Sequence, residues 1–142
     1  MMIPRGLPTA LFQLTIVIAV AVVLGLAVRI EPDSRGFGTH EQLGLQPCGY
    51  LQDTGRPCPS CGMTTAFSNT VRLRFGAAFR ANPAGFLLCL VAMATPLYLA
   101  HARLTHRRAS RIFDAPRLGW ILVGGAAILA ASWAYEISRH AG

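Results

Sequence analysis

The sequence predicts an all-α integral membrane protein with three transmembrane helices and a short amphipathic interfacial helix after a cysteine-rich turn. Two observations support this fold class. Hydrophobic residues make up 53% of the 142 residues and charged residues only 13%, with a mean hydropathy of +0.44, which is more apolar than an ordinary soluble domain. In addition, three uncharged segments are each long enough to cross the roughly 30 Å hydrocarbon core of a bilayer as a helix.

These uncharged segments set the predicted spans, at residues about 8–29, 83–102 and 118–135. A soluble domain of this size could not bury three helices that are apolar on every side, so we expect lipid around them. A cleaved signal peptide is a weaker interpretation of the first segment, because its apolar stretch is longer than a typical signal core. Residues 1–142 are therefore expected to form a single membrane domain.

Between the first two spans, residues 30–62 predict a polar, cysteine-rich loop and residues about 63–81 predict the amphipathic helix. Within this helix Phe67, Val71 and Phe75 recur every four residues, while arginines supply polar positions. A helix with one apolar stripe and one charged face is suited to the membrane surface.

Residues near the second span predict a bend and a helix start. Gly76 is the expected site of a bend in the amphipathic helix. Asn82 can cap the free backbone N–H groups of the second span, and proline suits the first helical position, which Pro83 would occupy.

The charged residues indicate a lipid environment and an orientation. All 13 basic residues are arginine, and six acids leave a formal net charge of +7. Five arginines lie in the short segment 103–117, which we interpret as a topology signal, with an anionic lipid site as the alternative. No nucleic acid partner is expected. Arginine density predicts a multi-pass protein of the cell inner (plasma) membrane with the cysteine-rich loop on the extracytoplasmic side.

The third span carries features of helix contact and of the membrane interface. Its small residues, spaced by four, would let another helix approach closely, so a homo-oligomer or a membrane protein partner is expected. They are Ala126, Ala130 and Ala134. Trp120 and Trp133 lie near the two ends of the span, where indole rings prefer the interface. Just beyond the span, Glu136 and Arg139 are expected to form a surface pair.

Three of the four cysteines fall within a short stretch that follows a histidine. These residues are His40, Cys48, Cys58 and Cys61. Zinc prefers four tetrahedral ligands, and three thiolates with one imidazole form a recognised set. The C-x-x-C pair supplies two ligands from one tight turn. The four residues are therefore the predicted metal ligands, and the cofactor would be zinc.

A membrane thiol-disulfide oxidoreductase is the alternative. A thiolate before a helix start, as Cys61 is expected to be, is favoured by free backbone N–H groups and by the helix dipole. Cys58 and Cys61 would alternate between dithiol and disulfide, with Cys48 as the resolving thiol. Such enzymes generally need a second cysteine pair, which the loop lacks.

A purely structural role for the thiols is the third interpretation. A disulfide, or thiols packed under the turn, could set the following helix against the bilayer, although three loop cysteines leave one unpaired. The fourth cysteine, Cys89, lies in the second span, where a thiol is an ordinary small apolar group.

The segment "CGYLQDTGRPCPSCGMTTAF", followed by "FGAAFRANP" and an apolar span, resembles an uncharacterised family of small bacterial membrane proteins, a domain of unknown function. The family signature is C-x5-TG-x2-CP-x-CG-x-TRA, then an amphipathic helix and NP at the start of a transmembrane helix. The matching residues are Cys48, Thr54, Gly55, Cys58, Pro59, Cys61, Gly62, Thr64, Ala66, Asn82 and Pro83. The chain departs from it at Thr65, where the family commonly has arginine. The resemblance implies membrane residence and a shared cysteine turn, and it implies no reaction.

Common catalytic motifs are missing from the sequence, which contains no GxxxxGKS/T, no HExxH and no GxSxG. We therefore expect a non-enzymatic accessory protein or membrane subunit, whose cysteine-rich turn binds zinc or forms a structural clamp.

Overall fold

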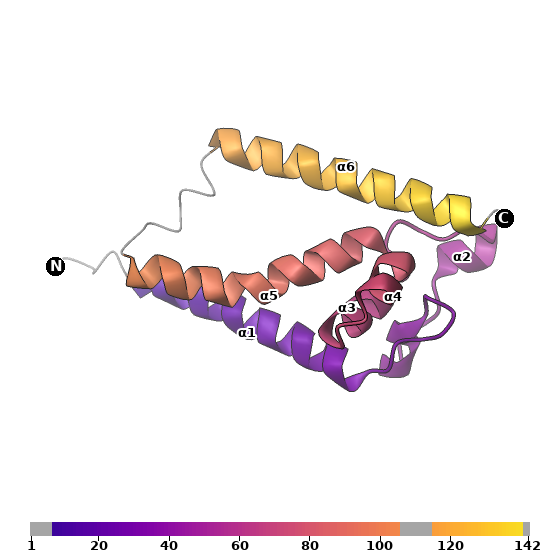
Figure 1. The fold of residues 1–142 in the computed structure, drawn as a ribbon, viewed down its shortest axis with the longest axis horizontal. Coiled ribbons are helices and arrows are strands. Elements are labelled where there is room, and N and C mark those ends of the chain that lie inside the picture. The colour runs from indigo at the N-terminus through magenta and orange to yellow at the C-terminus, as the bar shows by residue number, and fades with distance from the viewer. Residues whose placement is uncertain (1–6, 106–114, 141–142) are drawn as a thin grey trace.

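The computed structural model describes residues 7–105 and 115–140 (Figure 1). Within these ranges it holds helices and no strand, which confirms the predicted all-α class. In chain order the elements are α1 (Leu7–Arg29), the 3-10 helix η1 (Thr39–Leu43), α2 (Gly49–Thr54), α3 (Met63–Val71), α4 (Phe75–Ala81), α5 (Pro83–Leu104) and α6 (Ala115–His140). Most of the arginine-rich segment 103–117 lies outside the described residues.

Three of these helices are long and apolar enough to cross a membrane: α1, α5 and α6. Few of their side chains are buried by the rest of the protein, and only 6% of the most apolar stretch of α1 is enclosed. Large apolar groups face outward instead, such as Leu97, which is 73% exposed, and Trp120, which is 78% exposed. Length, composition and outward apolar surface are those of membrane-spanning helices.

The short helices gather at one end of the molecule, where α1 ends and α5 begins. Figure 1 shows α1 and α5 side by side, whereas α6 lies apart from α1 and meets α5 near the start of α5. We call the segment between α1 and α5, residues 30–82, the headpiece. It contains most of the buried polar side chains, so it is the part of the chain in which a defined site can form.

Helix α3 is the centre of the headpiece and packs against α1, α4 and α5. Six consecutive residues, Thr65–Thr70, are buried, so protein surrounds this helix, whereas the sequence predicted a helix with one face in lipid. Small and hydroxyl-bearing side chains allow this, because each hydroxyl finds a partner. Thr65 Oγ1 lies 2.7 Å from Thr39 Oγ1, and Ser68 Oγ donates to the carbonyl of Ile30 at 2.6 Å.

The predicted helix over 63–81 is divided into two helices by a break at Leu73. Leu73 has a φ of 60°, the left-handed conformation, and so ends α3 before the expected bend at Gly76. Of the two helices, α4 is the one with outward apolar surface, because it buries Ala78 but exposes nearly half of Phe79. The Phe79 ring contacts Tyr135 of α6 at 5.8 Å between centroids.

Arg72, just after α3, fixes the end of α1 to the headpiece. Its Nη1 donates to the carbonyl of Ala27 at 2.9 Å, and its Nη2 donates to the carbonyl of Val28 at 2.8 Å. The last carbonyls of a helix lack partners within the helix, and they carry the negative end of its dipole. The Arg72 guanidinium donates to these carbonyls and places a positive charge at the negative end of the dipole.

Helix α6 continues beyond the predicted end of the third span and docks onto the headpiece and the start of α5. The Ser132 hydroxyl oxygen accepts a hydrogen bond from the Ala84 backbone N–H at 3.2 Å. Trp133 Nε1 donates to the carbonyl of Pro57 at 2.9 Å, so this indole is held by the cysteine-rich loop. One further turn places Glu136 and Arg139 beside the headpiece.

Candidate cysteine site

The C-x-x-C segment forms a tight turn directly before α3. The Cys61 backbone N–H donates to the carbonyl of Cys58 at 3.0 Å, and the Cys58 N–H points at the Cys61 sulfur at 3.2 Å. The turn brings the two sulfur atoms to 3.1 Å from each other, and both cysteines are free thiols. Cys61 is buried and Cys58 is partly exposed.

Gly62 allows the turn to lie against the end of α4. Its φ is 78°, a left-handed conformation that glycine adopts without steric cost. A Cβ atom here would clash with the carbonyl oxygen of Ala81 and would lie 2.8 Å from that of Gly36. Two backbone segments thus approach this residue so closely that no side chain fits.

Asn82 joins the cysteine turn to α5. As predicted, its Oδ1 caps the helix, accepting from the Gly85 N–H at 2.6 Å. Its Nδ2 also donates to the carbonyls of Cys61, at 2.9 Å, and Pro59, at 3.4 Å. The side chain is fully buried, so an unpaired amide would be costly here. The sequence indicated the helix cap but not the second role, which depends on contacts about 20 residues back along the chain.

A third sulfur joins the pair from a separate segment. Cys48 lies at the start of α2, and its Sγ, together with those of Cys58 and Cys61, forms a group in which all atoms lie within 4.8 Å of one another. The structure therefore brings together the three loop cysteines that the sequence singled out. Cys89 is not among them: it is buried in α5, in the apolar cluster with Ala27 and Phe67.

His40 lies close to this group without belonging to it. Its Nε2 is 3.1 Å from the carbonyl oxygen of Gln46, and since a carbonyl only accepts, this nitrogen carries the proton. In the neutral ring, the other nitrogen is then the acceptor. His40 lines a pocket of about 250 Å³ together with Cys48 and Cys61.

The two thiols of the turn differ in acidity. Partial burial works to raise the pKa of Cys58, but hydrogen bonds with Ser60, Cys61 and Cys48 outweigh it and lower the pKa to about 7. Burial raises the pKa of Cys61 far above its usual range, and the neighbouring Cys58 thiol adds to the rise. Near neutral pH, Cys58 is thus the more reactive sulfur of the turn.

Glu136 is the acidic residue that sequence reasoning misplaced. Its expected surface position is wrong, because only 3% of the residue is exposed. Oε1 accepts from the Ser132 hydroxyl at 3.3 Å, and that hydroxyl lies 3.4 Å from Asn82 Oδ1. The spacing of four between Ser132 and Glu136, on an otherwise apolar helix, was the available signal that both lie on one protein-facing side.

Comparison with known proteins identifies a domain family but no characterised relative. Residues 48–95 match the model of the family described as "Protein of unknown function (DUF2752)". No curated protein and no solved structure matches the chain. The matched residues run from Cys48 through α3 and α4 into α5, and they include the three clustered cysteines and Asn82. The cysteine turn and the helices that hold it are therefore the part of the chain that is similar to this family of unknown function.

Proposed function

We propose that Cys48, Cys58 and Cys61 bind one zinc ion, and that this ion clamps the headpiece of a non-enzymatic membrane subunit or accessory protein. The observation that carries the proposal is the third sulfur. A turn with two thiols suits either a metal or a disulfide, whereas Cys48 approaches from a separate segment, just before α2, and adds the third sulfur that a structural zinc site needs.

The sulfur spacing suits a metal. In a tetrahedral zinc site with Zn–S distances of about 2.3 Å, the sulfur atoms lie roughly 3.8 Å apart. The 3.1 Å between Cys58 Sγ and Cys61 Sγ is somewhat shorter than this, and the 4.8 Å limit of the three-sulfur group is somewhat longer. Side-chain movements of about 1 Å would therefore make the three distances equal.

His40 is the proposed fourth ligand. Structural zinc sites are usually closed by four protein ligands, and Cys3His is one of the common sets. The unprotonated ring nitrogen of His40 is available for a metal, and the residue shares a pocket with Cys48 and Cys61. A rotation of the side chain would be required, because His40 lies outside the three-sulfur group.

We also infer that the long helices lie in the cell inner membrane, with the headpiece on the extracytoplasmic side. The outward-facing apolar surface of the helices and the density of arginines in segment 103–117 support this arrangement. The exposed small residues Ala126 and Ala130 of α6 would accept another membrane helix, from a second copy or from a partner protein. An impermeant maleimide applied to intact cells after treatment with a chelator and a reductant tests the sidedness, because only an extracytoplasmic Cys58, freed of zinc, would be labelled.

Metal analysis of the detergent-purified full chain tests the zinc site. We expect one zinc per chain, lost in Cys48→Ser and retained in Cys89→Ser, the matched control for loss of a thiol outside the group. Chelation should raise the number of thiols that react with a maleimide by up to three. A metal-free protein with all three thiols reactive from the start contradicts the proposal.

Thiol-disulfide exchange is the second candidate, favoured by the contrast between a partly exposed Cys58 and a buried Cys61 only 3.1 Å away. The Cys58 thiolate would attack a disulfide of a substrate protein, forming a mixed disulfide and releasing one substrate thiolate. Cys61 would lose its proton to solvent and attack the Cys58 sulfur, releasing the second thiolate. Two electrons would thus pass from the Cys58–Cys61 dithiol to the substrate.

The redox state of the purified protein separates these candidates. The zinc clamp predicts that Cys58 and Cys61 are reduced and protected by the metal. Thiol-disulfide exchange predicts that the protein is metal-free and that a Cys58–Cys61 disulfide forms and breaks in glutathione buffers. This disulfide should also form in Cys48→Ser.

A further inference from the structure

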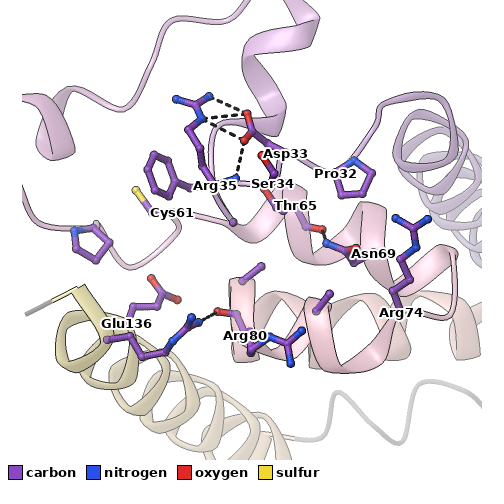
Figure 2. Close-up of a pocket in the computed structure, with 16 residues that line it drawn as sticks. Pro32, Asp33, Ser34, Arg35, Cys61, Thr65, Asn69, Arg74, Arg80 and Glu136 are labelled. Carbon is purple, nitrogen blue, oxygen red and sulfur yellow. Dashed lines mark hydrogen bonds and ion pairs between the residues drawn. The ribbon is translucent and has the colours of Figure 1, made fainter. Parts of the chain in front are cut away.

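A pocket of about 480 Å³ lies on the side of the headpiece that faces α6. Figure 2 shows it between the loop that carries Asp33 and Arg35, helices α3 and α4, and the end of α6. Its lining includes the buried residues Cys61, Thr65 and Asn69, so it reaches into the headpiece.

Exposed arginines from two segments line the opening of this pocket. Arg74 and Arg80 come from the two ends of α4, and Arg139 comes from the end of α6. The Arg139 guanidinium donates to the carbonyl of Arg80, which holds it beside α4 (Figure 2). The guanidinium groups of Arg74 and Arg80 make no hydrogen bond or ion pair with any residue in 7–105 or 115–140.

The remaining charges of the pocket lie on its other walls. Arg35 is already neutralised, since it pairs with Asp33 at 2.8 Å and with Glu41 at 3.0 Å. Glu136 is buried on the α6 side, across the pocket from Arg74 in Figure 2. Positive charge is therefore in excess along the α4 wall, where guanidinium donors are available.

We propose that this pocket binds a phosphate group. Guanidinium forks match the geometry of phosphate oxygens, and charge-assisted bonds of this kind are stronger than neutral ones. The volume is in the range of small-molecule sites, and the Asn69 side chain adds a polar group on α3.

The phosphate has two sources that fit the position of the pocket. It lies where α5 starts and α6 ends, at the depth where the headgroups of a surrounding bilayer would lie. A phospholipid headgroup could therefore enter from the side, and a soluble phosphate compound could enter from the aqueous phase. Both would use the same arginines.

Native mass spectrometry of the full-length protein in detergent, titrated with phosphatidylglycerol or phosphatidylcholine, tests the lipid source. We expect retention of phosphatidylglycerol to fall about fivefold for Arg74→Gln or Arg80→Gln and roughly 25-fold for the double variant. Arg56→Gln is the matched control, because Arg56 is an exposed arginine of the headpiece outside this pocket. It should bind like the wild type.

Inorganic phosphate, followed by calorimetry and by the thermal unfolding midpoint, tests the soluble source. Phosphate binding that depends on Arg74 and Arg80, weakens with added salt and occurs without lipid would support the proposal with a soluble anion as the ligand. If phosphatidylglycerol is retained and inorganic phosphate does not displace it, the proposal is supported with a lipid headgroup as the ligand.

The proposal is overturned if neither ligand binds, or if Arg56→Gln weakens binding as much as the pocket variants do. The unfolding midpoint of each variant shows whether it is folded. Among the residues that the structure describes, neither arginine side chain makes a hydrogen bond that its removal would break. Zinc content is measured on the same samples. Because the variants leave all cysteines in place, loss of phosphate binding with zinc retained separates this site from the metal clamp.

Discussion

The headpiece and the long helices obey different rules of packing. In the headpiece polar side chains are buried and paired, as Asn82 is, and backbone segments approach each other at Gly62. The long helices instead expose apolar side chains over most of their length, and Leu97 is 73% exposed. The stability of the headpiece therefore depends on individual residues. The long helices require only apolar side chains, which many sequences supply. Substitutions in each region test this contrast.

The largest effect is expected at Gly62. Gly62→Ala places a Cβ against the carbonyls of Ala81 and Gly36 in a left-handed residue, which should lower the free energy of unfolding by about 3 kcal/mol or more. The thermal unfolding midpoint in detergent measures this loss. Gly55→Ala is the control: Gly55 has a φ of 66° but no atom within 4 Å of the added Cβ. It should cost only about 1 kcal/mol. Equal losses of unfolding free energy in Gly62→Ala and Gly55→Ala would show that the close approach of the two carbonyls to Gly62 is unimportant.

Asn82→Asp should have the next largest effect. The carboxylate can still cap α5, but it cannot donate to the carbonyls of Cys61 and Pro59, and it places two acceptors against them. We expect a loss of about 2–3 kcal/mol in the free energy of unfolding. Thr95→Ala removes an exposed hydroxyl from α5 and should change stability by less than about 0.5 kcal/mol. If Asn82→Asp leaves the free energy of unfolding unchanged, then Asn82 stabilises the protein only by capping α5.

The cysteines of the two regions should differ in reactivity. In reduced, chelator-treated protein, maleimide labelling of Cys58 should accelerate as pH rises toward 7 and level off above it, because its pKa is lowered to about 7 and the thiolate is the reactive form. Cys89, buried in α5, should remain unlabelled at every pH. Peptide mass spectrometry resolves the sites. A midpoint for Cys58 near that of an ordinary thiol, about 8.5, would contradict the geometry of the turn.

The two tryptophans offer a smaller and closely matched test. Trp133→Phe removes the indole N–H that donates to Pro57 and should cost about 1 kcal/mol in the free energy of unfolding. Trp120→Phe, at a residue that is 78% exposed, should have almost no effect in detergent. Similar losses would indicate that both rings act only through the micelle surface.

The smallest effect is expected at Leu97 in α5. Leu97→Ala removes apolar atoms that face outward, so the unfolding midpoint should shift by the equivalent of less than about 0.5 kcal/mol. A loss of several kcal/mol would show that protein, from a second copy or a partner, covers this surface.

Much of the fold is local information and could be predicted from the sequence. The spans follow from uncharged runs of sufficient length, the start of α5 follows from Asn82 and Pro83, and the cysteine turn follows from its spacing. Burial of α3 could not be predicted, because a stripe with Phe67 and Val71 fits a helix on lipid as well as one enclosed by protein.

The remaining differences arise from contacts between distant segments. Leu73 gave no sign of its left-handed conformation, which occurs where the chain connects α3 to α4 and these two helices pack against each other. Glu136 is buried only because α6 docks on α5 through Ser132. The proximity of Cys48 to the C-x-x-C pair likewise depends on how the loop folds, and spacing alone could not show how far His40 lies from the three sulfur atoms.

The hydrogen bonds of the Asn82 amide make the arrangement of the three thiols depend on residues outside the cysteine segment. A peptide containing only residues 48–62 would lack the amide that holds two of its carbonyls, and also the indole that holds a third. Its sulfur atoms would sample many arrangements, so a ligand that binds all three would lose affinity to the entropic cost of fixing them. The arrangement of the sulfur atoms therefore depends on the residue that caps α5 and on α6 as well as on the cysteine segment itself.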